Sequence, residues 1–162
     1  MAELNGLDQA GFIHAVGWIF EHSPWVAERA FDARPFASMD ALHAAMTEQV
    51  ERGTFAERLA LLKAHPDLGA RARLSTASAQ EQAGAGLDSL TPGEFEQLQR
   101  LNTAYRNRFG FPFLLAVKGS TKHDVLRAIQ ARMEATPEDE FREALRQVYR
   151  IARFRLEDLI TS

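Results

Sequence analysis

TPEDEFREALRQVYRIARFRLEDLI, residues 136–160, is the stretch that decides the fold class. Thr136 followed by Pro137 is a typical helix start, because a threonine side chain can accept from a free backbone N–H and proline suits the first turn. On a helical wheel of about 100° per residue, a set of apolar side chains falls within roughly 60° of one centre line. They are Phe141, Leu145, Val148, Ala152, Leu156 and Leu159. The stretch therefore predicts a long amphipathic helix with one buried stripe.

Helix start signals of the same kind recur along the chain. A Ser, Thr or Asp stands before an apolar run, often with an acid three residues on, and a glycine or proline follows several of the ends. We expect helices at about residues 9–21, 24–31, 39–52, 55–65, 79–86, 92–109, 122–135 and 137–160.

One apolar segment, FPFLLAV at 111–117, could pass for a strand. It is too short and too isolated to build a sheet, so we interpret it as a buried irregular crossing or a short helix. Residues 71–90 form the most polar and glycine-bearing stretch, where loops around the short helix could carry a surface site. The prediction is an all-α protein without a sheet, in which residues 1–162 form a single compact multi-helix domain.

Composition removes several classes of function. The formal net charge is −3 and the arginines are scattered, so nucleic acid is not an expected partner. The absence of cysteine excludes thiol chemistry and fits an intracellular protein, and no apolar run of about 20 residues predicts a membrane span. We expect a cytoplasmic protein without membrane contact. No HExxH motif or pair of histidines at i and i+4 indicates a metal, so we expect no metal site.

Arg155 departs from the pattern of the last helix. It falls about 40° from the centre of the apolar stripe, whereas the neighbouring arginines fall roughly 100° or more away. A guanidinium that faces a core needs a carboxylate, carbonyls or an anionic ligand opposite it. A structural ion pair or a side chain that snorkels to solvent would account for Arg155, and so would a ligand site.

Two further positions have both a structural and a functional interpretation. Ser78 and Glu81 are spaced as a capping box, which would explain both without chemistry, whereas Gln82 and the small residues after it are left over. His65 ends an apolar helical run against Pro66, so it could serve the helix dipole or face a pocket. Acid/base chemistry by His, Glu and Arg is the kind that these residues allow.

Five blocks of the sequence resemble a known family, the decarboxylases of 2-oxo-4-hydroxy-4-carboxy-5-ureidoimidazoline (OHCU) in urate breakdown. The HPDL, EQ-AGL and FGFPF motifs within them are specific, and the blocks follow one another in order over most of the chain. They are EHSPW (21–25), LLKAHPDLGA (61–70), SAQEQAGAGL (78–87), LNTAYRNRFGFPFLLAVKG (101–119) and IARFRL (151–156).

The resemblance implies an all-helical carboxy-lyase of purine metabolism, usually a homodimer, that needs no metal or organic cofactor and forms S-allantoin. The histidine of HPDL is catalytic in that family, which implies His65 in this chain, and Glu81 and Arg155 are expected to act with it. The substrate site would be lined by Pro66, by the block Ser78, Ala79, Gln80, Glu81 and Gln82, by the main chain of Phe113, Leu114, Leu115, Ala116 and Val117, and by Arg155.

The chemistry of the substrate explains why these groups would suffice. Electrons released by departing CO2 can flow into the neighbouring C=N bond, and the enol-like product must then be protonated on one face. His65 could orient the 4-hydroxyl and exchange a proton, Arg155 offers a planar fork, and Glu81 and Gln82 can accept from N–H groups. The alternative is a helical ligand-binding or dimerisation module without activity on the same scaffold.

Overall fold

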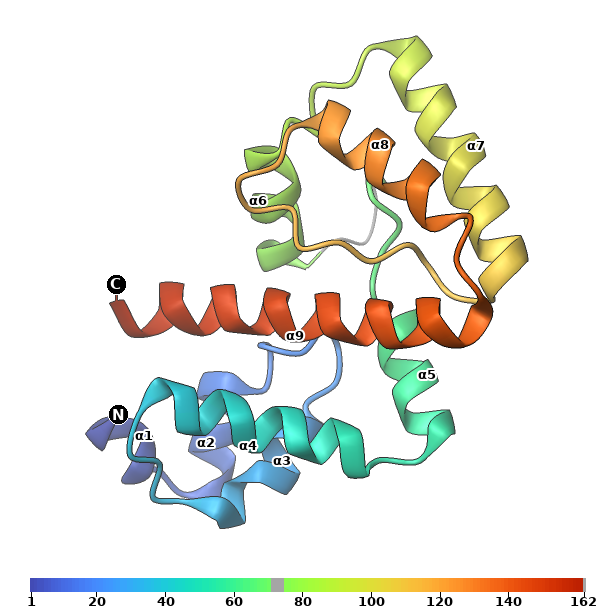
Figure 1. The fold of residues 1–162 in the computed structure, drawn as a ribbon. Coiled ribbons are helices and arrows are strands. Elements are labelled where there is room, and N and C mark those ends of the chain that lie inside the picture. Colours follow the sequence, from blue (N-terminus) through green and yellow to red (C-terminus); the bar gives the residue numbers. More distant parts are fainter. Residues whose placement is uncertain (71–74, 162) are drawn as a thin grey trace. The chain divides into compact units, whose positions relative to one another are not determined.

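The computed structural model describes residues 1–70 and 75–161, and the predicted loop at 71–74 lies outside them. Within these residues the chain forms helices and no strand, so the all-α prediction is confirmed (Figure 1). The helices are α1 (Ala2–Asn5), α2 (Gln9–Val16), α3 (Trp25–Ala30), the 3-10 turn η1 (Phe31–Ala33), α4 (Met39–Arg52), α5 (Phe55–Lys63), α6 (Thr76–Gly84), α7 (Pro92–Phe109), α8 (Lys122–Arg132) and α9 (Pro137–Thr161).

Packing divides the chain into two compact units. The first contains Met1–Ala64 and Tyr149–Ser162, and the second contains His65–Val148, so that α9 runs from one into the other. The prediction of one domain over residues 1–162 stays a prediction. Among the described residues, no helix is both long and apolar enough to span a bilayer.

The first unit is built around a core that α2, α3 and α4 supply. Phe12 of α2 is fully buried, its ring centroid lies 5.6 Å from that of Phe31, and Leu42 and Met46 of α4 are also fully buried. Two of the predicted helix starts in this unit are confirmed, since the side chains of Asp8 and Ser38 accept from backbone N–H groups at the first turns of α2 and α4. α3 begins at Trp25, and no side chain caps it.

The helix expected at residues 9–21 corresponds to α2, and its predicted end at residue 21 is wrong. α2 ends at Val16, and a turn of chain follows from Gly17. Ile19, Phe20 and Glu21 are each 1% exposed. Three consecutive buried side chains exceed what one face of an amphipathic helix can cover, and a glycine weakens a helix interior. The irregular chain after Gly17 therefore buries residues that a continued helix would expose.

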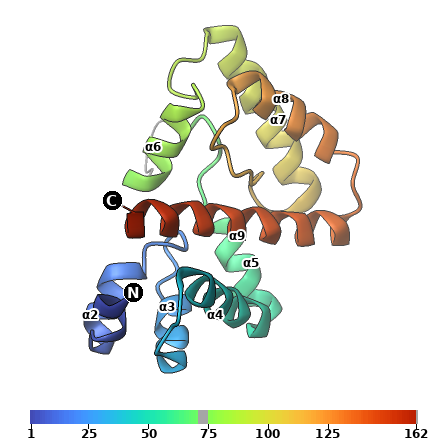
Figure 2. The same cartoon turned by 60° about the vertical axis from the view of Figure 1, so that its left-hand side comes forward.

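The second unit packs α6, α7, α8 and the first part of α9. α7 and α8 lie side by side in both views (Figures 1 and 2). Capping boxes at Thr91 and Thr121 open these two helices as predicted, and Gly110 ends α7 with a φ of 83°, where a glycine is favoured. The Tyr105 ring lies against those of Phe109, Phe111 and Phe113, which anchors the chain that follows α7.

Candidate functional site

The loop that follows His65 is the first part of the candidate site. α5 ends at Lys63 with Ala64 as its C-cap, so the helix stops just short of His65 rather than at it. His65 is only 6% exposed. The histidine therefore stands in an irregular, buried position, which is consistent with the effect expected of Pro66 on the residue before it.

Side chains from α6 and α7 hold three consecutive residues of this loop. The Asp67 carboxylate accepts from Arg106 at 2.8 Å. The Leu68 carbonyl accepts from Asn102 Nδ2 at 2.9 Å, and the Gly69 N–H donates to the Gln82 side-chain oxygen at 2.9 Å. These contacts fix the direction of the chain immediately after His65.

Gly69 is a requirement of that loop. Its φ is +80°, which side chains with a Cβ rarely adopt, and a Cβ there would lie 2.7 Å from a methyl group of Leu98. The loop can therefore approach α7 closely only because residue 69 has no side chain.

α6 carries the second part of the candidate site, and it begins earlier than predicted. The helix starts at Thr76 rather than near residue 79, and its cap is Ser75, whose side chain accepts from the backbone N–H of Ser78. The capping-box interpretation of Ser78 and Glu81 is therefore wrong, because Ser78 lies inside the helix. Ser75 is also followed by a suitable first turn, so the choice between the two serines rests on packing.

The exposure of the α6 residues separates them into two faces. Ser78 and Gln82 are buried at 5% and 6% exposed, and Glu81 beside them is half-buried. Ala79 and Gln80 point to solvent. The buried face thus brings Ser78, Glu81 and Gln82 together, and Gln82 connects it to the His65 loop through Gly69.

The segment 113–117 is the third part, and it is irregular, as one of the two interpretations predicted. The side chains of Phe113, Leu114, Ala116 and Val117 are buried, while Leu115 is half-buried. The expectation that the main chain is left for a ligand holds only in part. The carbonyl of Leu114 and the N–H of Ala116 are bonded to protein side chains, and the Val117 carbonyl accepts from the N–H of Ser120.

Arg155 lies in the first unit, where it is 3% exposed. Nη2 donates to Glu21 Oε2 at 3.0 Å, and Nη1 donates to the carbonyls of Trp18 and Ile19 at 3.4 and 3.3 Å. The prediction that this arginine enters the apolar stripe and meets an acid is confirmed. The acid itself, Glu21, was missed, although the EHSPW block that contains it was among the motifs.

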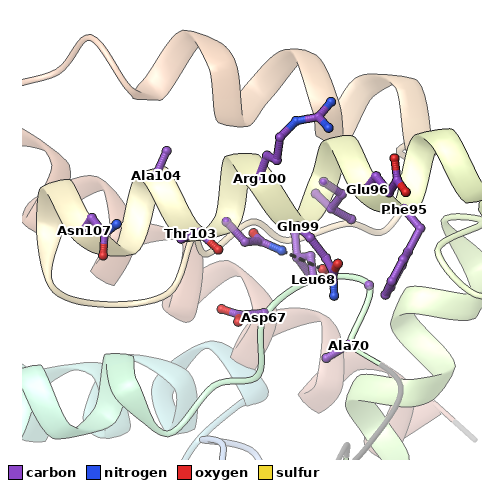
Figure 3. Close-up of a pocket in the computed structure, with 13 residues that line it drawn as sticks. Asp67, Leu68, Ala70, Phe95, Glu96, Gln99, Arg100, Thr103, Ala104 and Asn107 are labelled. Carbon is purple, nitrogen blue, oxygen red and sulfur yellow. Dashed lines mark hydrogen bonds between the residues drawn. The ribbon is translucent and has the colours of Figure 1, made fainter.

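A cavity of about 910 Å³ lies next to the His65 loop in the second unit. It is lined by residues 67–70 and by α7 residues between Phe95 and Asn107, as Figure 3 shows. Within the described part of the chain, none of the predicted site residues lines this cavity. It therefore shares with the candidate site only the loop that both border.

The fold places the chain in a known class of all-helical proteins. It matches the solved structure of (S)-allantoin synthase with a TM-score of 0.77 and 37% identity, over 98% of this chain and 53% of that one. A solved OHCU decarboxylase crystallised in the presence of (S)-allantoin matches with a TM-score of 0.72 over 85% of this chain and 92% of that one, and its 23% identity supports the fold alone.

Sequence comparison then gives the family. The OHCU decarboxylase family model matches residues 5–157. The 2-oxo-4-hydroxy-4-carboxy-5-ureidoimidazoline decarboxylase of Haloferax volcanii is 47% identical over all of this chain and 96% of its own length. The uric acid degradation bifunctional protein PucL of Bacillus subtilis is 48% identical over 99% of this chain, which covers 33% of that protein. The chain belongs to the OHCU decarboxylase family and is thus a carboxy-lyase.

Proposed function

We propose that this chain converts OHCU to S-allantoin and CO2 without a cofactor, with His65 as the acid/base group. The bond between C4 and the carboxylate breaks, CO2 leaves, and the electron pair passes into the adjacent C=N bond of the ring. Protonation of the enol-like intermediate on one face then gives a single enantiomer. The substrate supplies its own electron sink, so the protein has to bind, orient and move protons.

One observation carries this proposal: the Gly69 N–H donates to the Gln82 side chain at 2.9 Å. The bond ties the chain beside His65 to the buried face of α6, and so joins two of the three motifs that define the resemblance. The bond also fixes the orientation of the Gln82 side-chain amide. Because its Oε1 is engaged by Gly69, the amide would offer its NH2 donors to the substrate, and Glu81 would be the acceptor on this face.

The proposed roles of the other residues follow from burial and motif. Pro66 and Ser78 would line the site beside His65, and the main chain of 113–117 would meet the amide-like groups of the substrate. Arg155 would bind substrate charge or carbonyls, on the strength of the IARFRL motif and its burial. Ala79 and Gln80 have exposed side chains, so any contact from them would come through the main chain.

The proposal includes a homodimer in the cytoplasm. Light scattering coupled to gel filtration would give the mass of the particle in solution. A monomer at micromolar concentration would contradict the homodimer without bearing on the reaction.

The decisive experiment is a stereospecific activity assay. Freshly generated OHCU decays unaided to racemic allantoin, so purified protein should both accelerate CO2 loss and give an excess of the S enantiomer, with a chelator present. His65→Ala should lower kcat by about 100-fold or more. His123→Ala, at an exposed position of α8, is the matched control and should keep the wild-type rate. Full activity of His65→Ala would remove His65 from the mechanism.

A further inference from the structure

A buried polar cluster in the second unit lies behind the 113–117 segment. Glu140 of α9 is 1% exposed. Three polar atoms of neighbouring side chains contact its Oε1. Arg132 Nε donates to it at 2.7 Å, Arg132 Nη2 lies 2.5 Å from it, and the Tyr105 hydroxyl also donates to it. Burial, and then the bond to Glu140, raise the pKa of Tyr105 far above its usual value, so this hydroxyl stays a donor.

Arg132 connects this cluster to the segment. Its Nη1 donates to the Leu114 carbonyl, and its guanidinium lies over the Phe113 ring with 4.5 Å between the guanidinium carbon and the ring centroid. A rigid fork bonded to a buried carboxylate can hold a carbonyl in one place, because its donors cannot turn independently. Glu140 and Tyr105 thus set the direction in which Arg132 reaches Leu114.

Gln147 makes the second connection. Its Oε1 accepts from the Ala116 N–H at 3.0 Å in a buried position, and its Nε2 donates to Glu143 at 2.9 Å. Glu143 is in turn bonded to Arg146, which also lowers the pKa of Glu143 and keeps it ionised. An ionised Glu143 can only accept, so the NH2 end of Gln147 faces Glu143 and the oxygen faces Ala116.

The bonds from Arg132 and Gln147 reach Leu114 and Ala116, so Leu115 is the residue between the two that are held. Leu114 presents its carbonyl and Ala116 its N–H to protein side chains, whereas in the described part of the chain neither main-chain group of Leu115 has a hydrogen-bond partner. Leu115 therefore has an N–H and a C=O that no protein group within the described residues occupies, between the two main-chain groups that Arg132 and Gln147 hold.

We propose that Arg132 and Gln147 are positioning residues of the decarboxylase, which hold the Leu114 carbonyl and the Ala116 N–H so that Leu115 presents an adjacent donor and acceptor to the amide-like edge of the substrate. The inference rests on the proposed function. Neither side chain touches substrate in this arrangement, and each acts through the main chain of 113–117. Misplacement of a recognition group by about 1 Å can cost on the order of 100-fold in rate.

The test is a pair of variants at Gln147, assayed for kcat, KM and enantiomeric excess of allantoin. Gln147→Leu removes the acceptor for Ala116, and kcat/KM should fall about 10- to 100-fold with a loss of S excess. The double variant Glu143→Gln with Gln147→Glu exchanges the two side chains and restores an acceptor at Ala116. It should return kcat/KM to within about threefold of wild type, which a merely structural role for Gln147 would not require.

The role of Arg132 is tested with a double variant, so that Glu140 is not left as an unpaired buried charge. Arg132→Met with Glu140→Gln removes both charges together and keeps an acceptor for Tyr105, so the segment loses its bond at Leu114 and the guanidinium over Phe113. We expect a fall in kcat/KM of about 10-fold or more in protein that remains folded at the assay temperature. Arg142→Met, at an exposed position of α9, is the control and should be neutral.

The outcomes separate the two proposals. An active wild type, with both Gln147→Leu and the Arg132 double variant folded and within twofold of its kcat and KM, would overturn the positioning role and leave the proposed function standing. A wild type that neither accelerates CO2 loss nor imposes handedness would overturn the proposed function, and the positioning role with it.

Discussion

Arg155, which is buried, and Arg132, which is half-buried, bond the same kinds of group in different ways. Arg155 donates to Glu21 at 3.0 Å and reaches the carbonyls of Trp18 and Ile19 only at 3.3–3.4 Å, near the limit of a hydrogen bond. Arg132 donates to Glu140 at 2.7 Å and to the Leu114 carbonyl, and its guanidinium covers the Phe113 ring. Each arginine is thus paired with a buried acid, so the ion pair does not distinguish their roles. The carbonyls to which each arginine donates do.

An ion pair alone does not show whether an arginine serves the fold or the site. Arg155 matches a family motif and lies near main-chain carbonyls at 3.3–3.4 Å, whereas Arg132 matches no motif and is bonded to a segment of the candidate site. We therefore expect the loss of Arg155 to affect substrate binding directly, and the loss of Arg132 to act through residues 113–117.

The largest effect should come from Glu21→Ala. It leaves the Arg155 guanidinium, 3% exposed, without its carboxylate, and removing one partner of a buried pair costs about 3–5 kcal/mol. Urea unfolding followed by circular dichroism measures this loss. Glu28→Ala, at an exposed position of α3, is the control and should change stability by less than about 0.5 kcal/mol. A cost for Glu21→Ala similar to that of the control would mean that Arg155 is stabilised by other groups.

The same change at the other arginine should cost less. Glu140→Ala leaves Arg132 unpaired, but the Arg132 side chain is 14% exposed and can reach water, so we expect about 2–3 kcal/mol. The same unfolding measurement applies. If Glu140→Ala destabilised the protein more than Glu21→Ala, the cluster around Arg132 would contribute more to the fold than the one around Arg155, contrary to this expectation.

A matched pair of tyrosines tests the hydroxyl that supports Arg132. Tyr105→Phe removes the donor to Glu140 in a fully buried position and should cost about 1–1.5 kcal/mol. Tyr149→Phe removes a bond of the same type, from the Tyr149 hydroxyl to Glu51 at 2.7 Å, at a more exposed place, and should cost about 0.5 kcal/mol. Equal losses would show that burial of the Tyr105 hydroxyl adds nothing.

The smallest effect should come from an exposed pair. The hydrogen bonds from Arg29 and from the Thr54 backbone lower the pKa of Glu57 from 4.5 to about 2. Because the folded pKa is the lower one, this carboxylate stabilises the protein above pH 4.5, and the contribution is lost as the pH falls from 4.5 towards 2. Thermal unfolding of Glu57→Gln should therefore show a small deficit at pH 6 that shrinks through this window and at high salt. A deficit that persisted unchanged at pH 2 would assign it to something other than the charge.

Much of the fold could be predicted because its signals are local. Capping boxes at Thr54, Thr91 and Thr121 depend on residues three apart, and all three are present in the structure. The end of α2 could not be predicted in this way, since Ile19 and Phe20 are both 1% exposed and burial depends on the whole fold rather than on residues three apart. The start of α6 depended on a choice between Ser75 and Ser78 that local preference leaves open.

The candidate site divides in the same manner. Arg155 could be identified because an arginine inside an apolar stripe contradicts the period of a helix. Arg132 ends α8, where a basic residue is ordinary, and nothing in the sequence around it shows that the 113–117 segment crosses it. Gln147 and Glu140 on α9 are likewise polar side chains whose burial nothing in the sequence around them predicts.

Recognition of the substrate by the main chain of Leu115 would determine which residues control substrate specificity. Every residue except proline carries the same N–H and C=O, so a ligand that bonds only to the main chain cannot distinguish one apolar side chain at position 115 from another. A saturation library at Leu115 should then tolerate most apolar replacements, while a library at Gln147 should not. Substrate specificity would then depend on residues such as Gln147 and Arg132, which do not contact the substrate.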